Sequence, residues 1–241
     1  MFQSRLFKNL MCLGAACVMV VGNAWAANQA PDANEMLKRV RQAATLQQNQ
    51  DITGQIRKGR VKVPFTMSLR GEMVAFQYKI GDQTLRFDLK FKDKSQDIIA
   101  WNGKKSFKLP LDQYGKAIAG TDVTYEDLSM RFLYWPKAQI VQDEKAAKVK
   151  GRDCWIILIP NPNPKVGQYA WVRVWIDKEN GAMWQIDGIN DKGDLAKRFM
   201  LTSVMKLDDG AWFMKQMKIE VRDPKNSMKT IAVDFIDMNT P

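Results

Sequence analysis

The carboxylates of two short segments are the groups of this chain best suited to acid–base chemistry. Glu126 and Asp127 are adjacent, and Asp191 and Asp194 are three residues apart. Paired carboxylates serve as general acid and general base in hydrolases, but adjacent acids at a helix start also complement the positive end of the helix dipole. The second pair stands among glycine and asparagine residues, which are typical of a turn. We therefore expect no enzyme, and an envelope-lipid hydrolase is the less favoured alternative.

Histidine is absent from all 241 residues. Because it is the commonest general base near neutral pH and the commonest metal ligand, the Ser-His and Cys-His nucleophile schemes are excluded. Cys154 precedes an apolar run, which indicates a buried and inert thiol. Met214 and Met217 are the best pair for a soft metal, but residues three apart on a strand point to opposite faces. We expect neither a metal site nor a cofactor.

The N-terminus is typical of an export signal. Arg5 and Lys8 precede an apolar run over residues 10–21, and Ala24-Trp25-Ala26 supplies a small-x-small cleavage sequence. A membrane anchor is the alternative, yet the run is too short to span a bilayer. A lipoprotein signal centred on Cys17 is disfavoured because the apolar run continues past it. We expect residues 1–26 to be a signal peptide cleaved after Ala26, residues 27–241 to form one domain, and the protein to reside in the periplasm.

Local patterns predict a helix followed by a long series of strands. Asp32 is placed to cap a helix whose apolar residues extend to Leu46. From Ile52 the apolar period changes to two, and turn sequences such as Asn102-Gly103 arrive at short intervals. We expect a mainly β protein with a few helices, built on an antiparallel meander whose accumulated twist makes it curl.

A second, short helix is predicted where the alternation stops. Thr124 and Asp127 form a capping arrangement, and Pro136 ends the helical pattern. The apolar residues between them recur three or four apart, so the helix has one face to bury. Its predicted role is to cover the sheet, through Tyr125, Leu128 and Phe132.

In several strands one side-chain phase is nearly free of charge, more than a sheet with one wet face requires. A sandwich or barrel with a filled core explains this pattern as well as a pocket does. A pocket suits acyl chains, whose burial stabilises by about 0.8 kcal/mol per methylene. The residues expected to line it, from alternation, are Phe76, Tyr78, Leu85, Phe87, Leu89, Val174, Ile176, Trp184, Ile186, Phe199, Leu201, Phe213, Met217, Ile219, Val233 and Phe235.

Basic residues gather in two segments of the chain, whose formal net charge is +11. Such runs are usually the solvated face of a strand, and their functional alternative is attraction to anionic lipid or an acidic partner. We expect no nucleic-acid partner for an exported protein, and we expect any membrane contact to be peripheral. The residues are Arg57, Lys58, Arg60 and Lys62, followed by Lys104, Lys105 and Lys108.

One segment carries a family resemblance. Residues 120–128 read G-T-D-V-T-Y-E-D-L and resemble the G-[ST]-D-x-[ST]-Y-E-D-L segment of outer-membrane lipoprotein-sorting proteins of the LolA-like type. Residues 132–136, 150–155, 174–178 and 197–199 are similar to the same family in the same order. The likeness covers roughly residues 35–240.

The resemblance implies a half-open antiparallel barrel, covered by helices, around an apolar cavity. It favours the pocket over the filled core. It implies a periplasmic carrier that binds acyl chains of lipoproteins or lipids for transit toward the outer membrane. Its partners would be those lipoproteins or lipids, an inner-membrane transporter and an outer-membrane acceptor. The alternative is a lipid-sensing or transporter-accessory binding module, because LolA-like folds serve those roles too.

Overall fold

The computed structural model of the protein describes residues 31–45, 49–142, 147–206 and 212–239. The predicted signal peptide and the predicted helix end at Leu46 lie outside these residues. The helices are α1 (Ala33–Thr45), η1 (Leu111–Gln113), α2 (Tyr125–Ser129) and η2 (Arg131–Tyr134). The strands are β1 (Gln50–Lys58), β2 (Val61–Arg70), β3 (Met73–Ile80), β4 (Gln83–Phe91), β5 (Gln96–Asn102), β6 (Lys105–Lys108), β7 (Gln139–Val141), β8 (Lys148–Val149), β9 (Arg152–Pro160), β10 (Trp171–Asp177), β11 (Met183–Ile189), β12 (Leu195–Lys206), β13 (Trp212–Asp223) and β14 (Asn226–Met238).

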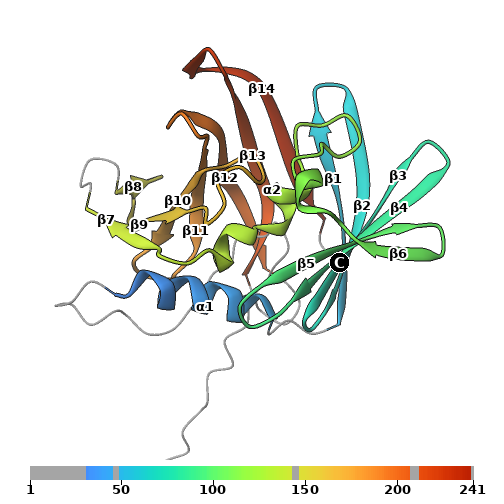
Figure 1. Cartoon of the computed structure of the whole chain (residues 1–241), viewed down its shortest axis with the longest axis horizontal. Coiled ribbons are helices and arrows are strands. Elements are labelled where there is room, and N and C mark those ends of the chain that lie inside the picture. Colours follow the sequence, from blue (N-terminus) through green and yellow to red (C-terminus); the bar gives the residue numbers. More distant parts are fainter. Residues whose placement is uncertain (1–30, 46–48, 143–146, 207–211, 240–241) are drawn as a thin grey trace, which may run out of the picture.

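The described strands form one antiparallel sheet that does not close. Its order is β6-β5-β4-β3-β2-β1-β14-β13-β12-β11-β10-β9-β7, and β8 pairs with β9 off this path. Most neighbours in sequence are neighbours in the sheet. The exceptions are β14, which returns beside β1, and β7, which pairs with β9 at the edge opposite β6. The sheet curves so that its two halves diverge around the helical segments (Figure 1). The prediction of a mainly β, half-open barrel covered by helices is confirmed.

The alternation of apolar and polar residues in β3 and β4 corresponds to the two faces of the sheet. Phe76 of β3 faces Phe87 of β4 across the ladder, and their rings stack with centroids 4.9 Å apart. Phe87 and Leu89 are buried, and Arg86 and Lys90 on either side of them are exposed. Asp88 between them is buried as well, where its carboxylate accepts from Arg86 and from the Trp101 indole N–H. One face of this half of the sheet therefore builds the core, as a period of two requires.

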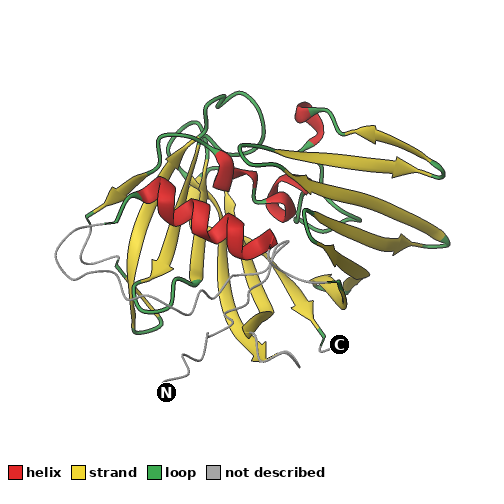
Figure 2. Ribbon diagram, turned by 90° about the horizontal axis from the view of Figure 1, so that it is seen from below, coloured by secondary structure: helices red, strands yellow, loops and turns green. Residues whose placement is uncertain are grey.

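Helix α1 covers the concave side. The Glu35 N–H donates to Asp32 Oδ1 over 2.9 Å, which confirms the predicted cap. Met36, Leu37 and Val40 are buried on its inner face. Figure 2 shows α1 lying across the strands, on the same side of the sheet as α2 and the 3-10 turns.

The second helix is shorter than the sequence predicts. α2 ends at Ser129, because Met130 adopts a left-handed conformation with φ 48°. The chain then continues as the 3-10 turn η2 and leaves helical geometry at Trp135, immediately before Pro136. The predicted continuous helix over Thr124–Trp135 is therefore wrong. A single αL residue splits it into two turns, which lets both halves press apolar side chains inward.

The phase expected for β14 is also wrong. Ile236 pairs with Met217 and with Ile56, so it faces the interior. Phe235 lies on the opposite face, with the Arg57 guanidinium 4.8 Å from its ring centre, and Val233 shares that face. The inward phase contains Asp234, whose charge made it look like the solvent side. One oxygen of its buried carboxylate, Oδ2, accepts from the loop before α2, whereas Oδ1 has no hydrogen-bond partner among the described residues.

Candidate functional site

Segment α2 is capped at its N-terminal end. The Asp127 N–H donates to Thr124 Oγ1 over 3.2 Å, and the Thr124 N–H donates to Asp127 Oδ2 over 2.9 Å. This reciprocal capping box confirms the predicted cap. Leu128 and Phe132 point into the core, and Tyr125 is half-buried. The three residues predicted to cover the sheet thus contact it from one short segment.

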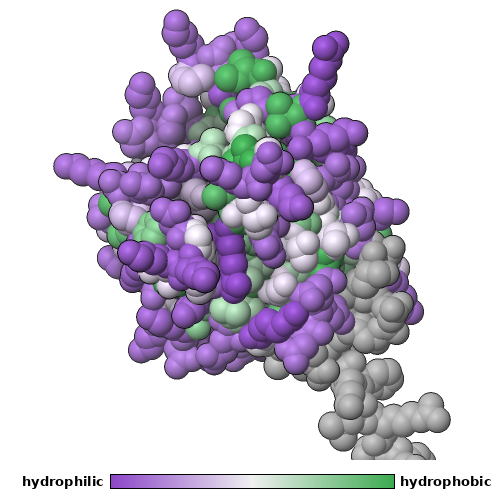
Figure 3. Space-filling model, turned by 90° about the vertical axis from the view of Figure 1, so that its right-hand side faces the viewer, coloured by the Kyte–Doolittle hydropathy of each residue, from purple (hydrophilic) through white to green (hydrophobic). Residues whose placement is uncertain are grey.

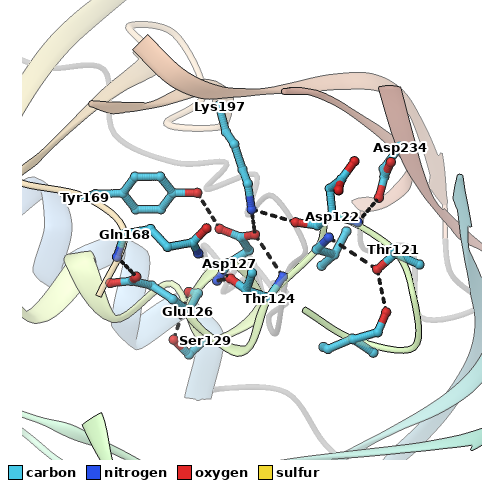
Figure 4. A network of polar contacts seen from close by, with 12 residues as sticks. Thr121, Asp122, Thr124, Glu126, Asp127, Ser129, Gln168, Tyr169, Lys197 and Asp234 are labelled. Carbon is cyan, nitrogen blue, oxygen red and sulfur yellow. Dashed lines mark hydrogen bonds and ion pairs between the residues drawn. The ribbon is translucent and has the colours of Figure 1, made fainter. Parts of the chain in front are cut away.

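A buried ion pair ties α2 to the centre of the sheet. The Lys197 ammonium of β12 lies 2.7 Å from Asp127 Oδ2, and their side chains are 8% and 1% exposed. The Tyr169 hydroxyl donates to Asp127 Oδ1 over 2.6 Å. Figure 4 shows Lys197 and Tyr169 converging on Asp127 from different parts of the chain. Both carboxylate oxygens are therefore satisfied, as a buried charge requires.

The loop before α2 is anchored in the same way. The Asp122 N–H donates to Asp234 Oδ2 over 2.7 Å, and Lys197 donates to the Asp122 carbonyl over 2.6 Å. The Lys58 ammonium of β1 lies 2.7 Å from Asp122 Oδ1. Burial raises the pKa of Asp234, and the neighbouring Asp122 carboxylate adds to the rise. Strands β1, β12 and β14 thus converge on this loop.

Glu126 fastens α2 to the loop between β9 and β10. Its carboxylate accepts from Arg131 Nε over 2.8 Å and from the Gln168 N–H. Burial raises the pKa of Glu126, and the Arg131 guanidinium opposes that rise. The Arg131 side chain also donates to the Val166 carbonyl over 2.8 Å. The second half of this loop therefore docks against α2.

Two glycines permit this close docking. A Cβ on Gly167 (φ +89°) would lie 2.3 Å from Glu126 Oε1. A Cβ on Gly188 of β11 would lie 2.3–2.7 Å from three atoms of the Tyr169 ring. Because such contacts are too short for any side chain, only glycine lets Tyr169 lie flat against β11 beneath Asp127.

The other side of α2 meets an aromatic cluster on the first half of the sheet. The hydroxyls of Tyr125 and Tyr78 are 3.1 Å apart, and the Tyr125 ring meets Phe87 edge-on with centroids 5.1 Å apart. Phe76 stacks on Phe87, as described above. α2 therefore bridges the two diverging halves of the sheet, with a hydroxyl pair on one side and an ion pair on the other.

The space beneath α2 is apolar and closely packed. It holds an enclosed cavity of about 20 Å³, on the scale of one water molecule. Of the residues predicted to line a pocket, Ile186, Phe199 and Met217 line this one, and Phe132 of the predicted cover lines it too. The other lining residues are Met130, Tyr169, Val172, Gly188, Ile236, Glu126 and Asp127. Within the described part of the chain, the space directly beneath α2 is therefore too small to hold an acyl chain as it stands.

The remaining predicted residues are distributed around this cavity or away from it. Most are buried in the surrounding core: Phe76, Tyr78, Phe87, Leu89, Val174, Ile176, Leu201, Phe213 and Ile219, with Leu85 packed against it. Trp184 is directed elsewhere. A register irregularity after Trp175 turns its indole toward Asp177, to which Nε1 donates over 3.1 Å. The Arg152 guanidinium covers that indole, 5.0 Å from the ring centre.

Sequence reasoning missed the polar residues that hold α2. Lys197 and Asp234 each interrupt an otherwise apolar phase, Lys197 before Phe199 and Leu201 on β12, and Asp234 before Ile236 on β14. A charge in an apolar phase is the available signal for a buried, paired group. Tyr169 and Gly188 carried no such signal, because their contact joins segments that only the fold brings together.

No cofactor or metal site emerges from these side chains. Within residues 31–239, gaps excepted, there is no group of three or more Cys, Asp or Glu side chains arranged to hold a metal ion. In the same described part of the chain, no helix combines the length and the apolar character needed to cross a membrane.

The sequence of this chain was compared with family models and with curated proteins. A family model described as "Uncharacterized protein" matches residues 81–241, more than half of the chain, so the chain belongs to that family. No curated protein matches the chain.

Solved structures share the fold at low sequence identity. An outer membrane lipoprotein-sorting protein domain from Vibrio parahaemolyticus superposes with a TM-score of 0.67 at 15% identity, covering 86% of this chain and 90% of that one. A DUF1329 family protein from Desulfovibrio piger gives 0.65 at 17% identity, with the same coverage of 86% and 90%. A LolA superfamily protein from Nitrosomonas europaea gives 0.63 at 13% identity, covering 87% and 92%. The chain thus has the LolA-like fold, as its segment at 120–128 predicted.

Proposed function

We propose that this protein is a periplasmic carrier that binds acyl chains of lipoproteins or lipids in the interior beneath α2. The observation that carries the proposal is the α2 segment itself. The sheet does not close into a barrel. The α2 segment, which is not part of the sheet, covers the apolar interior on its concave side. The shared fold of the lipoprotein-sorting protein domain supports the same function.

Binding requires α2 to move, because about 20 Å³ cannot hold an acyl chain. Each methylene that enters the interior contributes about 0.8 kcal/mol, so a 16-carbon chain yields on the order of 10 kcal/mol before ordering costs. Opening costs the contacts of Asp127, Glu126 and Asp122, whose polar groups regain water once exposed. The carrier therefore has a closed empty state and an open loaded state, and the cargo shifts the population toward the second.

Native mass spectrometry tests the proposal directly. The protein purified from cells, or incubated with an acylated peptide, should carry an added mass equal to one or more acyl ligands. The test variant is Met217→Phe, which places a larger side chain in the cavity lining. Its matched control is Met200→Phe on the neighbouring strand β12, because Met200 does not line the cavity. Loss of the added mass in the first variant alone is expected. A protein of clean unliganded mass under all conditions would rule the carrier out.

A lipid-sensing or transporter-accessory module is the second candidate. It is favoured by the tightly latched closed state, because a cover held by a buried ion pair suits a switch between two states. Crosslinking in cells separates the two functions. A carrier should be trapped with many lipoproteins, together with an inner-membrane transporter and an outer-membrane acceptor, whereas a sensing module should be trapped with one constant partner.

The proposal assigns no chemistry to the two adjacent acids. Glu126 and Asp127 line the cavity, but their carboxylates are engaged by Arg131 and Lys197. The double variant Glu126→Gln/Asp127→Asn tests an envelope-lipid hydrolase. Acyl-ester hydrolysis by the unmodified protein that this variant abolishes would replace the carrier proposal with an enzyme.

Export and processing complete the proposal. Cleavage after Ala26 removes two basic residues and no acid, which lowers the formal net charge from +11 to +9. The mature chain would then span residues 27–241 as one domain. Its intact mass, measured from a periplasmic extract, should correspond to an N-terminus at Ala27, and a mass that retains residues 1–26 would contradict the signal peptide.

A further inference from the structure

Several hairpin turns lie at one end of the sheet. Antiparallel pairing brings the turns at 59–60, 81–82 and 103–104 to the same end, because β1 to β6 run alternately up and down. Lys58 pairs with Asp234, so β14 enters from that end as well. The turn at 224–225 therefore lies there too. The loop before α2 is anchored to the same pair of residues, which places the cover of the interior at this end.

The β13–β14 hairpin projects beyond the other strands at this end. The pairing of β14 with β1 stops at Asp234, and the pairing of β13 with β12 stops at Val221. Among the described residues, the stretch between them is paired only within the hairpin. Beyond Val221 and its partner Ala232, the hairpin continues through Arg222 and Asp223 to the turn and returns through residues 226–231. Figure 1 shows the hairpin standing above the rest of the sheet.

Large apolar side chains are exposed on this projection. Met228 is 86% exposed and Ile231 is 53% exposed. Val61, Ile80 and Phe107, beside the neighbouring turns, are exposed as well. Figure 3 looks onto the side of the molecule where the β3–β4 and β5–β6 turns lie and shows apolar groups set among hydrophilic ones. Exposed apolar groups on a projecting element mark a contact with another apolar phase.

The charges around these apolar groups are mostly positive. Asp82 and Asp223 are the acids of the four turns and their flanks, and Asp223 lies 3.9 Å from Lys229. Several exposed basic residues at the turns form no ion pair within the described part of the chain: Arg60, Lys62, Lys79, Lys104, Lys105 and Lys225. Basic groups around exposed apolar tips complement the surface of an anionic bilayer, which attracts Lys and Arg and accepts apolar side chains.

We propose that this end of the sheet docks on anionic phospholipid bilayers, with Met228 and Ile231 entering the interface and the basic turns contacting the headgroups. This inference goes beyond acyl binding, because it assigns a second surface with its own ligand. It also orients the molecule. The loop before α2 faces the same bilayer, so an acyl chain passes between membrane and interior without crossing bulk water.

Vesicle co-sedimentation of the purified protein tests the docking. The probes are vesicles of phosphatidylcholine with or without about one third phosphatidylglycerol, at low and high salt. Binding is expected to the anionic vesicles and to weaken with salt, since the Debye length falls from about 10 Å at 0.1 M to about 3 Å at 1 M. Met228→Ser with Ile231→Ser should weaken binding by tenfold or more. Lys225→Gln should weaken it about fivefold.

Leu111→Ser is the matched control. Leu111 is exposed to a similar degree, but it follows β6 toward the opposite end of β5, so vesicle binding should be unchanged. All variants should bind acylated peptide normally, since none of these side chains lines the cavity. Loss of vesicle binding with retained acyl binding supports the docking surface alone. Equal binding by the hairpin variants, or a concentration-dependent dimer that they abolish, would overturn it.

Discussion

The Lys197 ammonium lies 2.7 Å from Asp127 Oδ2, and the two residues come from the middle of the sheet and from the segment that covers it. Both side chains are almost fully buried. A pair of this kind contributes little net stability over an apolar pair, but breaking it by removing one partner strands a charge in the core. The contact therefore defines where α2 must lie.

Replacing Lys197 by Met is expected to destabilise the protein by about 3–5 kcal/mol, because Asp127 would stay buried without its cation. Urea denaturation followed by tryptophan fluorescence measures this. Lys148→Met is the control, since its 3.4 Å pair with Asp153 is exposed and such pairs contribute about 0–1 kcal/mol. Equal stability of the two variants would show that the buried pair does not hold α2.

The contacts of Asp127 with Lys197 and Tyr169 form a latch that holds α2 against the sheet. Weakening this latch is expected to favour the loaded state. Tyr169→Phe keeps the ring against Gly188 and removes the 2.6 Å bond to Asp127, a loss of about 1.5–3 kcal/mol for a bond to a charged group. Since the open state then becomes more populated, apparent acyl affinity should rise by roughly tenfold.

A fluorescent fatty-acid binding assay measures this change. Tyr134→Phe, whose ring lies beside Arg41 and away from the latch, should leave affinity unchanged. Unaltered affinity in Tyr169→Phe, despite reduced stability, would separate the latch from ligand binding.

Gly188 should not tolerate a side chain. Gly188→Ala places a Cβ within 2.3 Å of the Tyr169 ring, and such overpacking costs about 1–3 kcal/mol. Gly115→Ala is the control, because its Cβ would meet only the flexible Gln168 side chain at 3.3 Å. Thermal unfolding should distinguish them, with a lower Tm for Gly188→Ala alone.

The raised pKa of Glu126 predicts a pH dependence. A folded-state pKa above the ordinary value means that the folded protein binds more protons at this site. Its contribution to stability is therefore complete below the unfolded pKa, near 4.5, and is lost as pH rises through the folded pKa. Glu126→Gln removes this loss. The free energy of unfolding of the variant minus that of the parent should increase between pH 4.5 and 8, and a difference independent of pH would contradict the assignment.

The Cys154 thiol should be inert in the folded protein. Burial raises its pKa to about 11, so the reactive thiolate is rare at pH 8. In a chain cleaved after Ala26 it is the one cysteine left. Reaction with a thiol reagent should be slow in buffer and stoichiometric in denaturant. Rapid labelling of the native protein would mean that β9 opens readily.

Much of the fold follows from local patterns. The period of two in β3 and β4, the turn sequence between them, and the Thr124–Asp127 cap each depend on residues close in the chain, so the sequence alone predicts them. The segment at 120–128 added the half-open barrel by resemblance, since alternation alone does not distinguish a filled core from a covered one.

The sequence-based predictions are wrong where contacts between distant segments decide which face of a strand points inward. On β14 the sequence favoured Val233 and Phe235 as the inner face, yet Asp234 and Ile236 point inward. Trp184 was expected in the pocket, but a register irregularity turns it toward Asp177. Bulges shift the phase of a strand by one residue, and a single sequence does not reveal them.

By itself, the sequence determined an antiparallel meander, two capped helical starts and chemistry without histidine, because these depend on side-chain type and short-range spacing. Only the tertiary structure decided that Lys197, Asp234 and Tyr169 meet beneath α2. It also decided that the space they close measures about 20 Å³. The physical reason is that a buried charge is tolerated only beside its partner, and here the partners lie as far apart as residues 122 and 234. Their meeting is a property of the curved sheet as a whole.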